Sequence, residues 1–297
     1  MKLSGRIRLR FVGIAIPLLL AGLLSWMFYR EWRQLKLERD LIQAIKRNES
    51  GRVIALLAAR ANPDARDGSL ASISVWQLTL DRLRGLSRPT IAGPTALLVA
   101  LEAQSTPNNR LTARHVQYTR IVCSLLSHGA YPNVRGPEGL TPLMMAAWTA
   151  DIESLNALLN HGAQVNAESD HRGTAIQYAT WAGSQQCIKA LVARGALVGE
   201  QDADGNSALL GAADANRLDT LKYLLERGAD PNSRNNAGTT ALMLMVRNGN
   251  TAAVRLLLDS GADPNAADRM GRTSLYWLRH KPHSEMAVLL RTRGATR

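Results

Sequence analysis

The sequence lacks the short motifs that carry most metal-dependent and nucleophilic chemistry. It contains only two cysteines, Cys123 and Cys187, and it has no C-x-x-C pair, no H-E-x-x-H, no P-loop and no G-x-S-x-G. Its six histidines do not follow the spacing of a zinc site. We therefore predict that the protein is not an enzyme and that it binds no cofactor and no metal.

Residues 138–297 have no net charge, although the whole chain carries a formal net charge of +12. They hold 16 basic and 16 acidic residues, whereas 1–40 hold 8 and 3, and 41–137 hold 12 and 5. A uniformly basic nucleic-acid binder is excluded by this distribution, so we predict no nucleic-acid partner. The basic 41–137 segment has two explanations, a surface that contacts anionic lipid or an ordinary solvated face.

A threonine or serine recurs every 33 residues in the second half of the chain, and a glycine follows each one after 21 residues. A fixed period of this length indicates a stack of similar small units rather than one closed core. A stack presents a long exposed surface, which favours binding as the function. The threonine position holds Thr141, Thr174, Ser207, Thr240 and Thr273, and the glycine position holds Gly162, Gly195, Gly228, Gly261 and Gly294.

Each unit is predicted to contain two short helices, a turn between them and a long loop after them. In the copy over 139–166, Thr141 and Pro142 start the first helix, because threonine caps helices well and proline is tolerated at the first helical position. Leucines at helical spacing form the second helix, which ends at Gly162. Two such helices cannot bury their apolar faces alone, so neighbouring units complete the core.

These residues resemble the ankyrin repeat, whose pattern is G-x-T-P-L-H-x-A-A, then two apolar residues, then G-A-D-x-N. Near matches are GLTPLMMAA at 139–147, GNSALLGAA at 205–213, and GADPN at 228–232 and 261–265. The resemblance implies an all-α ankyrin repeat solenoid that binds a protein partner, and we expect a monomer.

The sequence departs from the ankyrin pattern in two ways. Gly199 replaces the usual asparagine in one copy. The histidine of the T-P-L-H box is missing, so the resemblance does not carry over the hydrogen bonds that this histidine makes between repeats. Its place is taken by Met144, Gln177, Leu210, Met243 and Tyr276.

About seven units are predicted, with atypical first and last copies, as capping units should be. The period is interrupted by inserts at about 68–92 and 103–115, and the first insert is predicted to contain a short amphipathic helix. The repeat domain covers 41–297, with units at about 38–67, 93–135, 139–171, 172–204, 205–237, 238–270 and 271–297. The two cysteines lie two units apart, which is too far for a disulfide at the usual spacing of ankyrin repeats.

Residues 11–29 are apolar or small throughout. As a helix they span about 28 Å, close to the thickness of a bilayer core. No signal-peptidase site follows, so a single-pass transmembrane anchor is favoured over a cleaved signal peptide. A basic tail, 1–10, precedes the anchor, and 30–40 continue as a juxtamembrane helix without a flexible linker.

The orientation of this anchor follows only weakly from the charges, because basic residues lie on both sides of it. A short basic N-terminus ahead of the first apolar segment usually stays cytoplasmic. We therefore expect the repeats on the non-cytoplasmic, periplasmic side.

In ankyrin-like stacks, the loop tips and the exposed side of the first helix line a concave groove. The seventh residue after the threonine position is one of the family's variable binding positions, and Trp148 and Trp181 occupy it in adjacent units. Exposed tryptophan is uncommon unless it is used, so we predict that both form the apolar centre of the groove. The alternative is that both rings fold back as core. Asp214 and Arg247, at the same position in the next two units, are predicted to flank this centre, together with the tip residues Asp170, His171, Asp204 and Asn206. Glu102 holds the same position in an earlier unit and is a further candidate partner-binding residue.

Two functions stay open at this point. The first is a membrane-anchored interaction module, or scaffold, that holds a protein partner near the bilayer. The second is an inhibitor or immunity-type subunit that neutralises a toxin or enzyme at the membrane. Bacterial ankyrin-like proteins with one N-terminal anchor are compatible with either. An enzyme with the 68–92 insert as a lid is disfavoured, because neither insert holds a nucleophile and a base at useful spacing.

Overall fold

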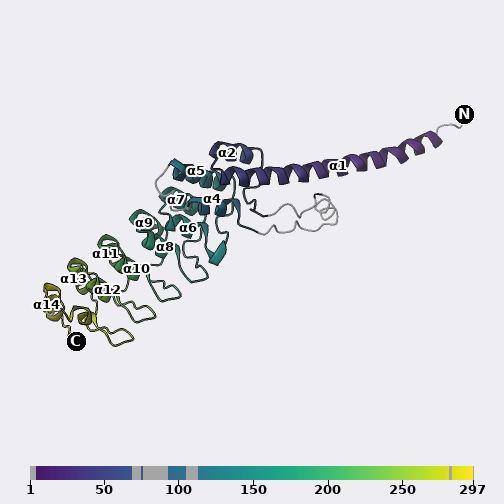
Figure 1. Cartoon of the computed structure of the whole chain (residues 1–297). Helices are drawn as coiled ribbons and strands as arrows, with labels where there is room; N and C mark the ends of the chain where they lie inside the picture. Colours follow the sequence, from purple (N-terminus) through teal and green to yellow (C-terminus); the bar gives the residue numbers. More distant parts are fainter. Residues whose placement is uncertain (1–4, 69–74, 76–92, 105–112, 281–282, 297) are drawn as a thin grey trace.

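The computed structural model describes residues 5–68, 75, 93–104, 113–280 and 283–296, with the side chains of 5–20 and 113–115 left out (Figure 1). In these residues the chain forms helices, turns and isolated β-bridges, and it forms no β-strand. The expectation of an all-α fold is confirmed for this part of the chain.

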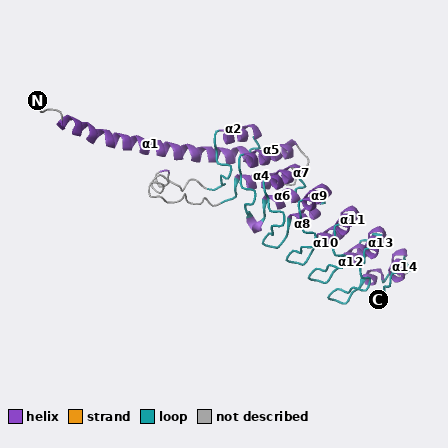
Figure 2. Ribbon diagram, turned by 180° about the vertical axis from the view of Figure 1, so that it is seen from behind, coloured by secondary structure: helices purple, strands orange, loops and turns teal. Residues whose placement is uncertain are grey.

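The helices follow one another in pairs. In Figure 1 the first helices of the pairs form one row and the second helices form a row beside it, while the long loops project from the other side of the first row. Figure 2 shows the same two rows from behind. The pairs are α1 (Gly5–Lys46) and α2 (Ser50–Ala58), α4 (Ala96–Gln104) and α5 (Ala113–Ser127), α6 (Pro142–Trp148) and α7 (Ile152–Asn160), α8 (Ala175–Ala182) and α9 (Gln185–Ala193), α10 (Ala208–Asp214) and α11 (Leu218–Glu226), α12 (Ala241–Arg247) and α13 (Thr251–Asp259), and the 3₁₀ turn η4 (Ser274–Leu278) and α14 (Glu285–Thr292). A short 3₁₀ turn, η3 (Pro137–Gly139), precedes α6.

Helix α1 differs from the others because only its C-terminal part packs in the stack. The remainder projects beyond the first pair, so that the N-terminus and the C-terminus lie at opposite ends of the molecule (Figure 1). Leu41 and Ile45 are fully buried, and they close the first pair against α2 and α4. The helix continues without a break through 30–40, so the predicted juxtamembrane segment and the first helix of the first unit form one rod.

The ends of the helices follow from the repeated threonine and glycine. The Thr141 hydroxyl accepts a hydrogen bond from the Met144 N–H (3.4 Å) and caps α6. Gly162 takes a left-handed conformation (φ 86°) after α7, and the Ala163 N–H then donates to the Leu158 carbonyl (3.0 Å). This arrangement satisfies carbonyl groups that a helix end leaves unpaired. The threonine cap at the start of a helix and the glycine at its end therefore act as the sequence predicts.

The core runs along the stack between the two helix rows. The residue two positions after the threonine position points into it, and five of these residues are at most 2% exposed: Leu97, Leu143, Ile176, Leu209 and Leu242. The sixth, Leu275, is only half-buried and lies on a 3₁₀ turn rather than on an α-helix. The unit at 271–297 therefore differs from the units before it.

A ladder of asparagines joins the loops of adjacent units. Asn166 donates from Nδ2 to the Gly195 carbonyl (3.0 Å) and accepts at Oδ1 from the Leu197 N–H (3.0 Å). Asn133, Asn232 and Asn265 make the same pair of bonds to their following units. Gly199 occupies the equivalent position between Asn166 and Asn232. One rung is missing there, since glycine has no side chain to make it.

Gln177 corrects one expectation from the sequence, that the hydrogen bonds made by the family's histidine do not carry over. Its Oε1 accepts from the Thr174 N–H (2.8 Å), and its Nε2 donates to the carbonyls of Glu200 (3.1 Å) and Asn206 (2.7 Å) in the next loop. A glutamine amide has both an acceptor and donors, so it can replace the imidazole. At this unit the inter-repeat bonding is present.

A buried carboxylate joins the second and third pairs. Asp151 is 4% exposed and caps α7, where its Oδ1 accepts from the N–H groups of Glu153 and Ser154 (both 3.1 Å). Its Oδ2 accepts from Gln104 Nε2 on α4 (2.7 Å) and from the Thr119 hydroxyl on α5 (2.9 Å). One side chain therefore fixes the relative positions of three helices.

Among the described residues, we find no helix that is both long and apolar enough to cross a membrane. The predicted anchor at 11–29 is not borne out by this finding, and its residues 11–20 have side chains outside the described set. Most of the 68–92 insert, its expected amphipathic helix and residues 105–112 of the 103–115 insert also lie outside the described residues.

Candidate functional site

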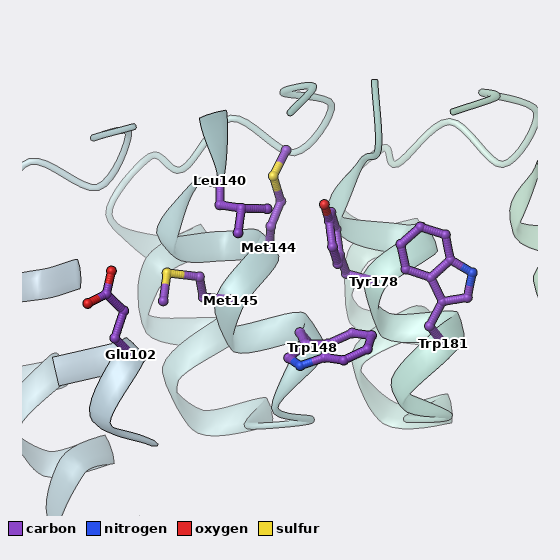
Figure 3. A pocket seen from close by; sticks show the side chains of 7 residues that line it. All are labelled: Glu102, Leu140, Met144, Met145, Trp148, Tyr178 and Trp181. Carbon is purple, nitrogen blue, oxygen red and sulfur yellow. The ribbon is translucent and has the colours of Figure 1, made fainter. Parts of the chain in front are cut away.

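An apolar groove of about 520 Å³ opens on the first-helix row, across α4, α6 and α8. We call it the tryptophan groove. Figure 3 shows its side chains converging on one space from the three helices and from the loop before α6. Its lining consists of Glu102, Leu140, Met144, Met145, Trp148, Tyr178 and Trp181.

Three aromatic rings form one wall of the tryptophan groove. Tyr178 lies between the two tryptophans, with its ring centroid 6.3 Å from that of Trp148 and 5.1 Å from that of Trp181, and it meets both rings edge to face at 84°. Edge-to-face contacts of this kind are favourable and hold ring orientations. Trp148 and Trp181 nevertheless remain 41% and 38% exposed. The rings are ordered by each other and still present apolar surface to solvent.

Helical spacing explains why these residues meet. Tyr178 and Trp181 stand three residues apart on α8, as do Met145 and Trp148 on α6, so each pair shares one helix face. In the next unit Gly211 occupies the position equivalent to Tyr178 and Met145, and a Cβ there would lie 3.2 Å from Trp181 Nε1. The missing side chain leaves room for the Trp181 indole against α10, and the aromatic wall ends there.

Among the described residues, the carboxylate of Glu102 is the one charged group in the lining of the tryptophan groove, at its α4 end (Figure 3). Partial burial and the nearby negative charge of Asp67 raise the pKa of Glu102 above its ordinary value. Both causes disfavour the charged form. A cation placed beside Glu102 would relieve this, so the groove combines an apolar wall with a site for a basic group.

Asp214 and Arg247 lie outside the lining of the tryptophan groove. They occupy the two following units and form an ion pair with each other, with Arg247 Nη2 2.8 Å from Asp214 Oδ1. Both side chains are largely exposed, so the pair contributes little to stability. The structure thus joins two of the predicted flanking residues to each other and separates them from the aromatic wall.

The predicted loop-tip residues divide into exposed and internal ones. Asp170, His171 and Asp204 are exposed, and Asp170 lies 3.7 Å from Arg135 Nη2. Asn206 is half-buried and works inside the stack, where its Oδ1 accepts from Asn235 Nδ2 (3.1 Å) and its carbonyl accepts from Gln177. None of the four lines the tryptophan groove.

Sequence reasoning missed Tyr178, Met145, Leu140 and Met144 as lining residues. A signal for the first two was present, because they lie four residues after the threonine position and three before the tryptophans, and residues three apart share a helix face. Leu140 comes from the loop before α6, and only the three-dimensional structure shows that it reaches the groove.

The two thiols are free and poorly suited to nucleophilic chemistry. Burial raises the pKa of both, and the charge of Asp151 raises them further. The thiolate is the reactive form, so a raised pKa leaves little of it at neutral pH. Cys187 is fully buried as well.

The comparison with protein families agrees with the repeated helix pairs. The model for ankyrin repeats (three copies) matches residues 110–202, 172–235 and 209–296. A search of curated proteins found no match. Together the three matches run from residue 110, between α4 and α5, to residue 296, and they cover more than half of the chain. The protein belongs to the ankyrin repeat family.

Proposed function

We propose that this protein is a membrane-tethered interaction module that binds a protein partner in the tryptophan groove. Ankyrin repeats generally mediate protein–protein interaction, and the family matches include the two units that carry the aromatic wall. The observation that carries the proposal is the pair of partly exposed tryptophans fixed by Tyr178. Ordered aromatic surface is typical of binding hot spots, because little side-chain entropy is lost when it is covered.

The chemistry of the tryptophan groove defines the partner further. Its wall is apolar, and the only charged residue that lines it in the described part of the chain is Glu102, whose raised pKa reflects an unfavourable environment for the negative charge. The complementary segment carries bulky apolar side chains and a lysine or arginine at the end that reaches Glu102. An inhibitor or immunity-type role is the special case in which the partner loses activity when it is bound.

The tether in this proposal is the 11–29 segment. Its support is the apolar sequence itself and the exposed Trp26, Tyr29 and Trp32 that follow its centre, since these residue types favour the membrane interface. The repeats are proposed to lie on the periplasmic side, from the short basic N-terminus ahead of the segment.

The test is capture of partners from membranes by the full chain and by the variants Trp148→Ala and Trp181→Ala. Each truncation should weaken binding by about 2 kcal/mol, which is roughly thirtyfold in Kd, as at other hot spots. The captured partner is then purified and its Kd for each variant is measured, together with its activity in the bound state.

The matched control is Tyr131→Ala, which removes an exposed aromatic side chain (55% exposed) outside the groove. Its Kd should equal that of the wild type. Equal capture by all variants would contradict the proposal. A large fall in the unfolding midpoint of the tryptophan variants would show instead that the rings serve as core.

A further inference from the structure

A second groove, of about 480 Å³, lies between α1 and the C-terminal end of α2. Arg30 and Arg33 line it from α1, and Arg60 lines it from the turn after α2. All three residues are exposed, and within the described part of the chain none of them forms an ion pair with a carboxylate. Three positive charges therefore line one space, and no carboxylate of the described residues forms an ion pair with them.

The backbone at Arg60 is unusual for an arginine. Arg60 has φ 70° and stands at the glycine position of its unit, where the later units have glycines with φ between 85° and 94°. The following Ala61 N–H donates to the Leu56 carbonyl (3.0 Å), which is the same helix ending as in those units. The left-handed conformation is unfavourable for any residue with a Cβ. The first unit thus places a third guanidinium in the groove at a position where glycine would be more stable.

The groove adjoins the proposed membrane segment. Arg30 is the first residue after 11–29, and its guanidinium lies 5.5 Å from the ring centroid of Trp26. Trp26, Tyr29 and Trp32 are all exposed, and such residues lie at the level of lipid headgroups. If the tether holds, the groove opens at that level.

We propose that Arg30, Arg33 and Arg60 bind the phosphate of an anionic phospholipid headgroup. Guanidinium groups match phosphate oxygens with paired hydrogen bonds, which makes arginine suited to this ligand. Three arginines in one groove favour a headgroup of net negative charge over a zwitterionic one, whose own cation would be repelled. The inference rests on the membrane tether of the proposed function, and it assigns a role to the basic residues that the interaction groove does not use.

A simpler role for Arg60 must be separated from this one. A positive charge at the C-terminal end of a helix is favourable by itself, and Arg60 lies two residues after the end of α2. In that case replacing Arg60 would change stability without changing the affinity for lipid.

The experiment uses the full chain in a nonionic detergent. It is titrated calorimetrically with soluble dihexanoyl phosphatidylglycerol, with dihexanoyl phosphatidylcholine and with inorganic phosphate. We expect phosphatidylglycerol to bind at least tenfold more tightly than either of the others. Arg60→Gly should weaken phosphatidylglycerol binding about tenfold and raise the unfolding midpoint, because glycine relieves the left-handed backbone and a Cβ is not needed there. Arg47→Ala, which removes the same charge from the far end of α1, should leave binding unchanged.

Three results would overturn the proposal. Unchanged phosphatidylglycerol binding in Arg60→Gly would leave only the helix-end role. Inorganic phosphate that binds as tightly as the lipid would assign the groove to a free anion. Equal binding of phosphatidylcholine would show that charge does not select the ligand. Because the lipids are soluble and the protein is in detergent, these results do not depend on whether the full chain is retained by a membrane, so a failure of the tether can be recognised separately.

Discussion

Gly199 leaves a gap in the asparagine ladder that a single substitution can fill. Its backbone does not need glycine, since its φ lies outside the left-handed region, and a Cβ at Gly199 would meet open space. Gly199→Asn should add the two hydrogen bonds that Asn166 makes one unit earlier. We expect a gain of about 1 kcal/mol in the free energy of unfolding from these bonds, measured by urea denaturation.

Gly199→Ala is the control for this prediction. Either substitution reduces the conformational entropy of the unfolded chain, which by itself stabilises by about 0.4–1 kcal/mol. Only asparagine adds the rung. If the asparagine variant is no more stable than the alanine variant, the ladder contributes nothing at this position.

The raised pKa of Glu102 predicts how partner binding depends on pH. Because burial and Asp67 raise this pKa above its ordinary value of 4.5, the carboxylate becomes neutral at a higher pH than an exposed glutamate does. A basic partner group should therefore bind more weakly as the pH falls toward that range. As the pH is lowered from 7 to 4.5, Kd should rise for the wild type at a higher pH than for an ordinary glutamate, and it should not change for Glu102→Gln. If the wild-type Kd is also independent of pH, the partner does not place a basic group beside Glu102.

Which residues meet across units was only partly predictable from the sequence. The 33-residue period placed Trp148 and Trp181 at equivalent positions, and the structure puts both in one groove. It could not show that Gln177 makes the inter-repeat bonds, because its partners lie 23 and 29 residues away and depend on the path of a loop. Nor could it show that Asp214 pairs with Arg247 rather than flanking the tryptophans.

At the scale of helices, Asp151 connects two neighbouring pairs through four hydrogen bonds. It caps α7 and accepts hydrogen bonds from α4 and α5 while almost fully buried. Asp151→Ala should lower the free energy of unfolding by about 3 kcal/mol, because a cap is lost and the buried groups of Gln104 and Thr119 lose their acceptor. Denaturation in urea measures the loss.

Asp151→Asn provides the comparison for Asp151→Ala. Asparagine caps a helix about as well as aspartate, but the amide nitrogen that would replace Oδ2 is a donor and can accept neither the Gln104 nor the Thr119 hydrogen bond. Its stability should fall between those of the wild type and the alanine variant. Equal stability of all three proteins would show that the connection is not needed.

The helices themselves were largely predictable, and the exception is informative. The caps and the left-handed glycines are local signals, so the α6–α13 units follow the sequence pattern. In the last unit the first helix is only a 3₁₀ turn, with Tyr276 and Trp277 exposed at 37% and 36%. Thr273 is present at its usual position there, but this local signal does not produce a full α-helix.

For the molecule as a whole, the proposed tether gives a direct prediction. The full chain should stay with membranes after an alkaline carbonate wash. Leu20→Arg combined with Leu24→Arg should release it, since each arginine near the middle of an apolar span costs roughly 2.5–3.5 kcal/mol of insertion. The control is Leu197→Arg, at an exposed leucine of the stack (51% exposed), which should leave the chain in the membrane fraction. Wild-type protein that washes off would refute the tether.

Helix α1 has one more consequence, if the chain is tethered through its N-terminal part. It is unbroken from Gly5 to Lys46, and its C-terminal end is itself part of the stack. No flexible linker therefore separates the membrane segment from the repeats that carry the tryptophan groove. The direction in which the groove faces around the axis of α1 is then set by the number of helical residues between the membrane segment and the stack. One residue inserted near 30 would turn the whole stack by about 100° around the helix axis. Seven would return it almost to its first direction and lift it about 10 Å higher. A partner fixed in the same membrane would distinguish these two insertions, while a freely diffusing one would bind both alike.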